Sequence, residues 1–151
     1  MQGFWLLVHV LGFTLWIGGG MATMVAGVAA KNFAPGDRLK AYKLVGAVQR
    51  LLVGPGAAAV VFSGVIMVLT GPSMHSGEMP AWLNIMMGAG IVGGLVALIV
   101  SVPTASRMSH LELQGGALPP TFASLRKRQV LSATIAGSLA LIALFAATLG
   151  R

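Results

Sequence analysis

Four long stretches of this chain contain no Asp, Glu, Lys or Arg, and they constrain its fold more than any other feature. They cover residues 1–30, 51–77, 79–106 and 129–150. A helix needs about 20 mainly apolar residues to cross the hydrocarbon core of a bilayer, so each stretch is long enough. Only 9% of the residues are charged, whereas a soluble domain has about a quarter. The sequence therefore predicts an all-α, four-helix transmembrane bundle.

The predicted spans cover about 3–30, 44–70, 81–106 and 129–150, in antiparallel up-down order within one domain, 1–151. The turn-forming strings "APGDR" and "LQGGALPP" break the first and third connections. Pro55 removes a backbone hydrogen bond inside the second span, so we expect a kink there. Gly90 and Gly94 form a GxxxG pair, which favours close packing of the third span against a neighbour.

The basic residues predict the orientation of the bundle. The nine that precede Arg151 lie in or beside the first and third connections; they are Lys31, Arg38, Lys40, Lys43, Arg50, Arg107, Arg126, Lys127 and Arg128. Cytoplasmic loops carry an excess of Lys and Arg, so both termini are expected on the non-cytoplasmic side. We interpret the basic residues behind the net charge of +7 as topology signals and as contacts to lipid head groups. We therefore expect no nucleic acid among the partners, and the lipid bilayer as the main one.

His9 is the residue that most needs an explanation, because it interrupts an apolar span. Ionisable residues within spans are rare, usually face the bundle interior and mark functional sites. A neutral imidazole can bind a metal through one nitrogen while the other donates a hydrogen bond. Two interpretations stay open: an axial ligand of haem b iron, and a structural histidine bonded to a backbone carbonyl or a threonine.

Counting depth at 1.5 Å per residue puts His9 roughly 9 Å below the outer boundary. Gly64, Met87 and Gly88 fall at the same level on the second and third spans. His and Met are both known haem ligands, so Met87 is the candidate for the opposite ligand. The two glycines are expected to leave room for a porphyrin. Arg50 lies inside the inner end of the second span, where it either extends toward the head groups or pairs with the carboxylates of a cofactor.

A second candidate metal site lies in the middle connection, "GPSMHSGEM". It gathers Met74, His75 and Met79 at the outer surface. Thioethers and imidazole suit Cu(I), so this cluster predicts copper binding as an alternative to haem.

Three strings resemble a known group of small bacterial membrane proteins. They are "LLVHVLGFTLWIGG", "RLLVGPGAAAVVFSGVIMVLTG" and "AWLNIMMG". They resemble the first three helices of four-helix proteins related to the copper-resistance D (CopD) domain and to HemJ-type protoporphyrinogen oxidases, and most of all a predicted integral-membrane family of unknown function in that group. The resemblance implies a location in the bacterial inner (cytoplasmic) membrane.

In HemJ-like proteins the histidine of the first helix binds haem b, and this role carries over to His9. Their third helix has a lysine shortly after the Trp-Leu pair, where this chain reads "NIMMG". The resemblance therefore supports haem binding more than porphyrinogen oxidation. CopD-like proteins imply copper uptake.

The chain has few candidate catalytic residues, since its three acidic residues lie outside the spans and no nucleophile–base pair is evident. Whether the protein is an enzyme stays open. The leading hypothesis is a haem b protein with a redox or electron-transfer role near the outer face. The alternatives are a copper-handling membrane protein and a cofactor-free accessory subunit of a larger membrane complex. A redox partner and a homo-oligomer are both compatible with the sequence.

Overall fold

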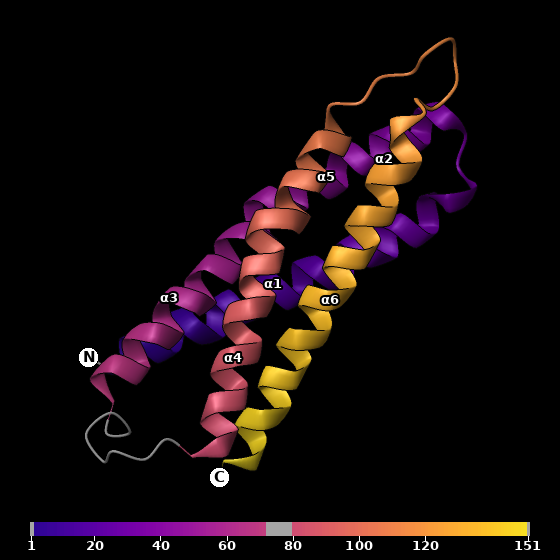
Figure 1. The fold of residues 1–151 in the computed structure, drawn as a ribbon. Helices are drawn as coiled ribbons and strands as arrows, with labels where there is room; N and C mark the ends of the chain where they lie inside the picture. The colour runs from indigo at the N-terminus through magenta and orange to yellow at the C-terminus, as the bar shows by residue number, and fades with distance from the viewer. Residues whose placement is uncertain (1, 72–79, 151) are drawn as a thin grey trace.

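The computed structural model describes residues 2–71 and 80–150. These residues contain four helices that are long and apolar enough to cross a membrane, namely Gln2–Asn32, Pro35–Thr70, Ala81–Ser109 and Thr121–Leu149. They contain no β-strand. The prediction of an all-α four-helix bundle is confirmed. The four spans lie side by side, and the chain begins and ends at the same end of the bundle (Figure 1).

Each of the first three spans is divided by local changes in helix type. The first consists of α1 (Gln2–Ala29) and a 3₁₀ turn, η1 (Ala30–Asn32). The second consists of α2 (Pro35–Val48), a π-helical turn, η2 (Gln49–Val53), and α3 (Gly54–Thr70). The third consists of α4 (Ala81–Val96), a π-helical turn, η4 (Ala97–Ser101), and α5 (Val102–Ser109). The fourth is the single helix α6 (Thr121–Leu149).

Two helices begin earlier than the sequence predicts. The second span begins at Pro35 instead of about 44, and the fourth at Thr121 instead of about 129. The prediction ended the spans where basic residues begin, but a helix can continue through the head-group region. Pro35 also favours a helix start, because its fixed φ suits the first turn and its missing N–H is not needed there.

The prolines inside the second and third spans each follow a π-helical turn. Pro55 comes two residues after η2, and Pro103 two residues after η4. A π-helical turn adds one residue to the hydrogen-bonded ring, so the ladder can pass a residue that has no N–H. A kink was predicted at Pro55; the structure has a π-helical turn, η2, that ends two residues before that position.

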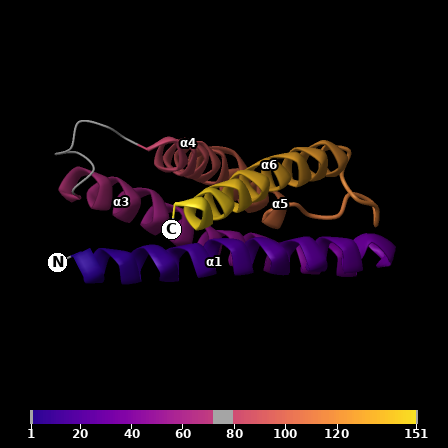
Figure 2. The same cartoon turned by 90° about the horizontal axis from the view of Figure 1, so that it is seen from below.

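The helices associate as two pairs, α1 with α3 and α4 with α6. Figure 2 shows α1 along one side of the bundle and α4 and α6 on the other. Gly12 and Gly56 let the first pair approach closely, since a Cβ built on Gly56 would lie 2.7 Å from the Gly12 carbonyl oxygen. Lipid gives helices no hydrophobic reason to associate, so this close packing supplies much of the attraction.

Contacts between α2 and α5 join the two pairs at the end of the bundle that carries the basic residues. A Cβ on Gly46 would lie 2.6 Å from the Cβ of Ser109, which shows how closely these helices approach. Hydrogen bonds from buried side-chain amides also connect the spans within each pair. Gln49 donates to the Thr23 hydroxyl at 3.2 Å, and Gln129 to the Ser101 hydroxyl at 3.0 Å.

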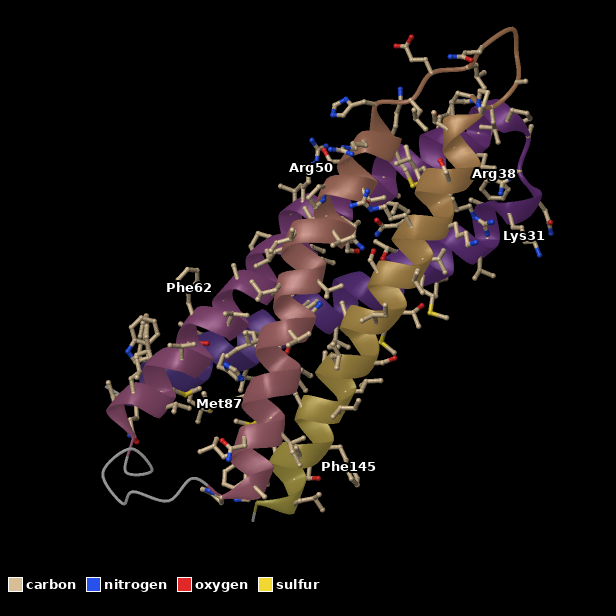
Figure 3. The ribbon with its side chains drawn as sticks, viewed as in Figure 1. Lys31, Arg38, Arg50, Phe62, Met87 and Phe145 are labelled. Atoms are coloured by element: carbon tan, nitrogen blue, oxygen red, sulfur yellow. The ribbon has the colours of Figure 1, made fainter. Side chains whose placement is uncertain are left out.

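The outer surface of the bundle is apolar, as contact with lipid requires. Phe62 on α3 and Phe145 on α6 are 70% and 66% exposed, and both side chains project from the bundle in Figure 3. Soluble monomers rarely expose large contiguous apolar patches. Together with the length and hydropathy of the four helices, this surface is that of a multi-pass membrane protein.

Candidate cofactor site

A cavity of about 680 Å³ lies between the two helix pairs, in the half of the bundle that carries the termini. All four spans line it, and its size falls in the range of about 300–1,000 Å³ that is typical of small-molecule sites. Its walls are mostly apolar. Trp16, which is only 3% exposed, lines it and also belongs to the packed cluster of small side chains deeper in the bundle.

His9 lines this cavity and is held by a hydrogen bond to the neighbouring helix. Its Nδ1 lies 3.0 Å from the Ser63 Oγ. The hydroxyl of Ser63 has one hydrogen, which it donates to the Ala59 carbonyl at 2.5 Å. The Ser63 Oγ also lies 3.3 Å from the Val60 carbonyl. A hydroxyl that donates to either carbonyl presents a lone pair toward His9, and we infer that the hydrogen between the two side chains then belongs to Nδ1. The Val60 carbonyl also faces the ring from α3.

This assignment fixes the chemistry of the other ring nitrogen. A neutral imidazole has one N–H and one lone pair, so a proton on Nδ1 leaves the lone pair on Nε2. Histidines that bind metals commonly donate their second nitrogen to a protein acceptor, which orients the ring and selects the tautomer. His9 has this arrangement with Ser63. A purely structural histidine could make the same hydrogen bond, so this bond alone does not indicate a ligand role. The adjoining cavity is the feature that favours a ligand role.

Gly64 lies directly against the imidazole. A Cβ at this position would be 3.2 Å from the His9 Cε1 and 3.5 Å from Nδ1. Both residues line the cavity. Gly64 was expected to leave room for a porphyrin. In the structure, the absence of a side chain at Gly64 instead allows the His9 ring to lie close to α3.

Thioether groups line the cavity as well. Met67 of α3 and Met86 and Met87 of α4 all border it, and the labelled Met87 side chain lies in the half of the bundle that contains the termini (Figure 3). Met87, predicted at the depth of His9, therefore lines the same cavity as the histidine. Met86 does so too, which leaves two adjacent residues of α4 as candidates for the opposite ligand.

Two predicted residues do not border the cavity. Gly88 is exposed, with no atom within 4 Å of a built Cβ, whereas Gly90 lines the cavity. Arg50 is exposed near the middle of the second span, in η2, where its Nε contacts the Gly46 carbonyl at 3.4 Å. Val60, the first residue of α3 that lines the cavity, comes 10 positions later, or roughly 15 Å along a helix, so Arg50 is too distant to pair with a group in the cavity.

The predicted copper cluster of Met74, His75 and Met79 lies outside the described residues. Within residues 2–71 and 80–150, no group of three or more His, Cys, Asp or Glu side chains is placed to hold a metal ion. Comparison of the chain with protein-family models, curated proteins and solved structures finds no match. The likeness to CopD-like and HemJ-like proteins stays a prediction from the sequence.

Sequence reasoning missed Ser63 and Gly90. Ser63 directly precedes Gly64, so the depth count had already placed a hydroxyl group at the level of His9. That signal was available, because a neutral imidazole needs a partner and hydroxyl groups are scarce at this depth. Gly90 was interpreted only as a packing residue. Its place on the cavity wall depends on the rotation of α4, which spacing along one helix does not determine.

Proposed function

We propose that this chain is a haem b-binding integral membrane protein with a redox or electron-transfer role near the end of the bundle that carries its termini. The observation that carries the proposal is the position of His9 on the wall of a large, mostly apolar cavity, with its Nδ1 3.0 Å from the Ser63 hydroxyl oxygen. If the basic end is cytoplasmic, as the charge distribution predicts, this cavity lies near the outer face.

The number of protein ligands favours haem over a bare metal ion. One imidazole and a few thioethers line the cavity, and structural zinc sites, for comparison, take four protein ligands. Haem brings four nitrogens of its own and needs only one or two axial ligands from the protein. His9 and Met87, which both line the cavity, would provide that set. The apolar walls also suit a largely apolar macrocycle.

Bound haem would supply an iron centre that exchanges one electron. The chain itself holds the ligand and sets its surroundings. Ser63 orients the His9 ring through Nδ1, and Gly64 lets that ring lie close to α3. Apolar residues of all four spans limit access of water, and solvent exposure and axial ligation are two of the factors that set the potential of a haem.

The direct test is the absorption spectrum of the full chain, expressed with added haem precursor and purified in detergent. We expect a Soret band and reduced-state bands typical of haem b. Copper measured by elemental analysis in a colourless protein would support the copper-handling alternative instead. A colourless protein without metal would leave the accessory-subunit hypothesis and refute haem binding.

Ser63→Ala tests the tautomer assignment. Removing the acceptor of the Nδ1–H frees the imidazole to rotate, and loss of such partners typically lowers metal affinity about 10- to 100-fold. We therefore expect weaker haem retention during purification and a shifted reduction potential, measured by redox titration of the haem that remains. The matched control is Ser132→Ala, which removes a buried hydroxyl of α6 that donates to the Gln129 carbonyl. Equal losses in both variants would contradict a specific role for Ser63.

Met87→Leu tests the opposite axial ligand. Methionine ligation raises the potential of a haem, so replacing Met87 should shift the spectrum and lower the reduction potential. Leucine has a similar volume and leaves the wall apolar, so little stability should be lost. The neighbouring variant Met86→Leu is the control, since both residues line the cavity. If Met86→Leu lowers the potential and Met87→Leu does not, the ligand assignment moves to Met86.

A further inference from the structure

A second depression of the surface lies at the basic end of the bundle, far from the cofactor cavity. It is a groove of about 780 Å³ along the first half of α6, with Arg38 of α2 on one side. Arg126 and Lys127 line the part of the groove near the start of α6. Val130 and Leu131 line the part that follows along α6, toward the middle of the bundle. The groove is thus cationic at one end and apolar at the other.

The cations of this groove have no acidic partner in the part of the chain that the structure describes. The only ion pair there joins Lys40 to Asp37 at 2.9 Å. The Nε of Arg38 is moreover buried without a hydrogen-bond partner. A buried donor that lacks a partner is costly, more so when it is charged. The buried Nε of Arg38 therefore indicates that an anion from outside the described part of the chain binds here.

Aromatic rings hold the two arginines in place. The guanidinium of Arg38 lies over the Phe122 ring, 5.2 Å from its centroid. Phe122 packs edge to face against Tyr42, with ring centroids 5.1 Å apart. The Tyr42 hydroxyl accepts a hydrogen bond from the Arg126 Nε at 3.0 Å. The stack fixes both guanidinium groups on the wall of one groove, where their remaining N–H groups can face a shared anion. Figure 3 shows Arg38 at this junction of α2 and α6.

We propose that this groove is a binding site for an acidic phospholipid. Its phosphate would bind Arg38, Arg126 and Lys127, and an acyl chain would lie along Val130 and Leu131. Planar guanidinium groups match phosphate oxygens through paired hydrogen bonds. Val130 and Leu131 are 55% and 59% exposed, so a chain can reach them from the bilayer. Basic pockets between spans on the cytoplasmic side are known to bind lipid head groups.

The test uses the full chain in detergent, with phosphatidylglycerol, phosphatidylcholine of the same acyl chains, and inorganic phosphate as probes. Binding is measured by native mass spectrometry and by the melting temperature. Phosphatidylglycerol should bind and raise the melting temperature, whereas the other two should do neither. Equal binding of both lipids would overturn the proposal. Inorganic phosphate that binds as tightly as phosphatidylglycerol would also overturn it, because the apolar wall would then contribute nothing.

Three single variants locate the site. Lys127→Gln removes a cation at an exposed position, so it should fold normally and weaken phosphatidylglycerol binding about fivefold. Arg128→Gln makes the same charge change one residue later on α6, at an exposed position outside the groove, and should leave the affinity unchanged. Equal weakening by both variants would show a diffuse surface attraction and refute a defined site. Arg38→Gln should weaken binding most, because Arg38 contributes the buried Nε.

Discussion

Replacing His9 by alanine is expected to abolish the Soret absorbance of the purified protein. The substitution removes the imidazole of His9, which is the one histidine among residues 2–71 and 80–150 that lines the cavity. Folding should be largely unaffected, because Ser63 keeps its bond to the Ala59 carbonyl and the change enlarges a cavity that already exists. The measurement is the ratio of Soret to protein absorbance, together with the melting temperature in detergent.

His110→Ala is the matched control for this experiment. His110 is exposed at the end of α5 and does not line the cavity, so its removal should leave the haem content unchanged. Addition of imidazole to the His9→Ala protein should restore part of the absorbance, because the vacated space admits a free ligand. Full haem content in His9→Ala would refute the assignment of His9, and that residue would then be a structural partner of Ser63.

The fold followed from the sequence because a bilayer imposes a simple condition on length and polarity. Four uncharged stretches could hardly become anything except four spanning helices. The ends of those helices were harder to predict. Basic residues mark the edge of the hydrocarbon region, but they do not end a helix. The helices α2 and α6 therefore begin before the predicted limits.

For the candidate site, the sequence predicted only the depth of each residue in the membrane. A rise of 1.5 Å per residue places His9, Gly64 and Met87 at one level, and all three line the cavity. Depth does not determine which way a residue faces. Gly88 follows Met87 by about 100° of rotation, a consequence of 3.6 residues per turn, and it faces outward.

The GxxxG pair shows the same limit within one helix face. A Cβ on Gly94 would lie 2.5 Å from a methyl group of Val61, so Gly94 packs tightly against α3. Gly90, one turn earlier, has no atom within 4 Å of a built Cβ and borders the cavity. The helix pairs separate between these two positions. One motif therefore serves packing at one residue and leaves open space at the other.

Gly56→Leu should cause the largest loss of stability among the glycine substitutions. A side chain there would meet the Gly12 carbonyl and the Trp16 amide nitrogen, both at 2.7 Å, and backbone atoms cannot move aside as side chains do. Overpacking costs about 1–3 kcal/mol, and we expect the upper end. Since about 1 kcal/mol shifts melting by about 2–4 °C in a chain of this size, the melting temperature should fall by about 6–12 °C. Gly137→Leu is the control, because nothing lies within 4 Å of a Cβ there.

The same variant also links the packing of α1 against α3 to the cofactor site. His9 and Ser63 belong to these two helices, and their bond of 3.0 Å exists only while the helices stay close. A leucine at Gly56, about two turns from Ser63, should wedge the pair apart and break that bond. We therefore expect Gly56→Leu to lose haem as well as stability, with Gly137→Leu retaining both. Loss of stability with full haem content would mean that the imidazole is positioned without Ser63, and the tautomer argument would fail.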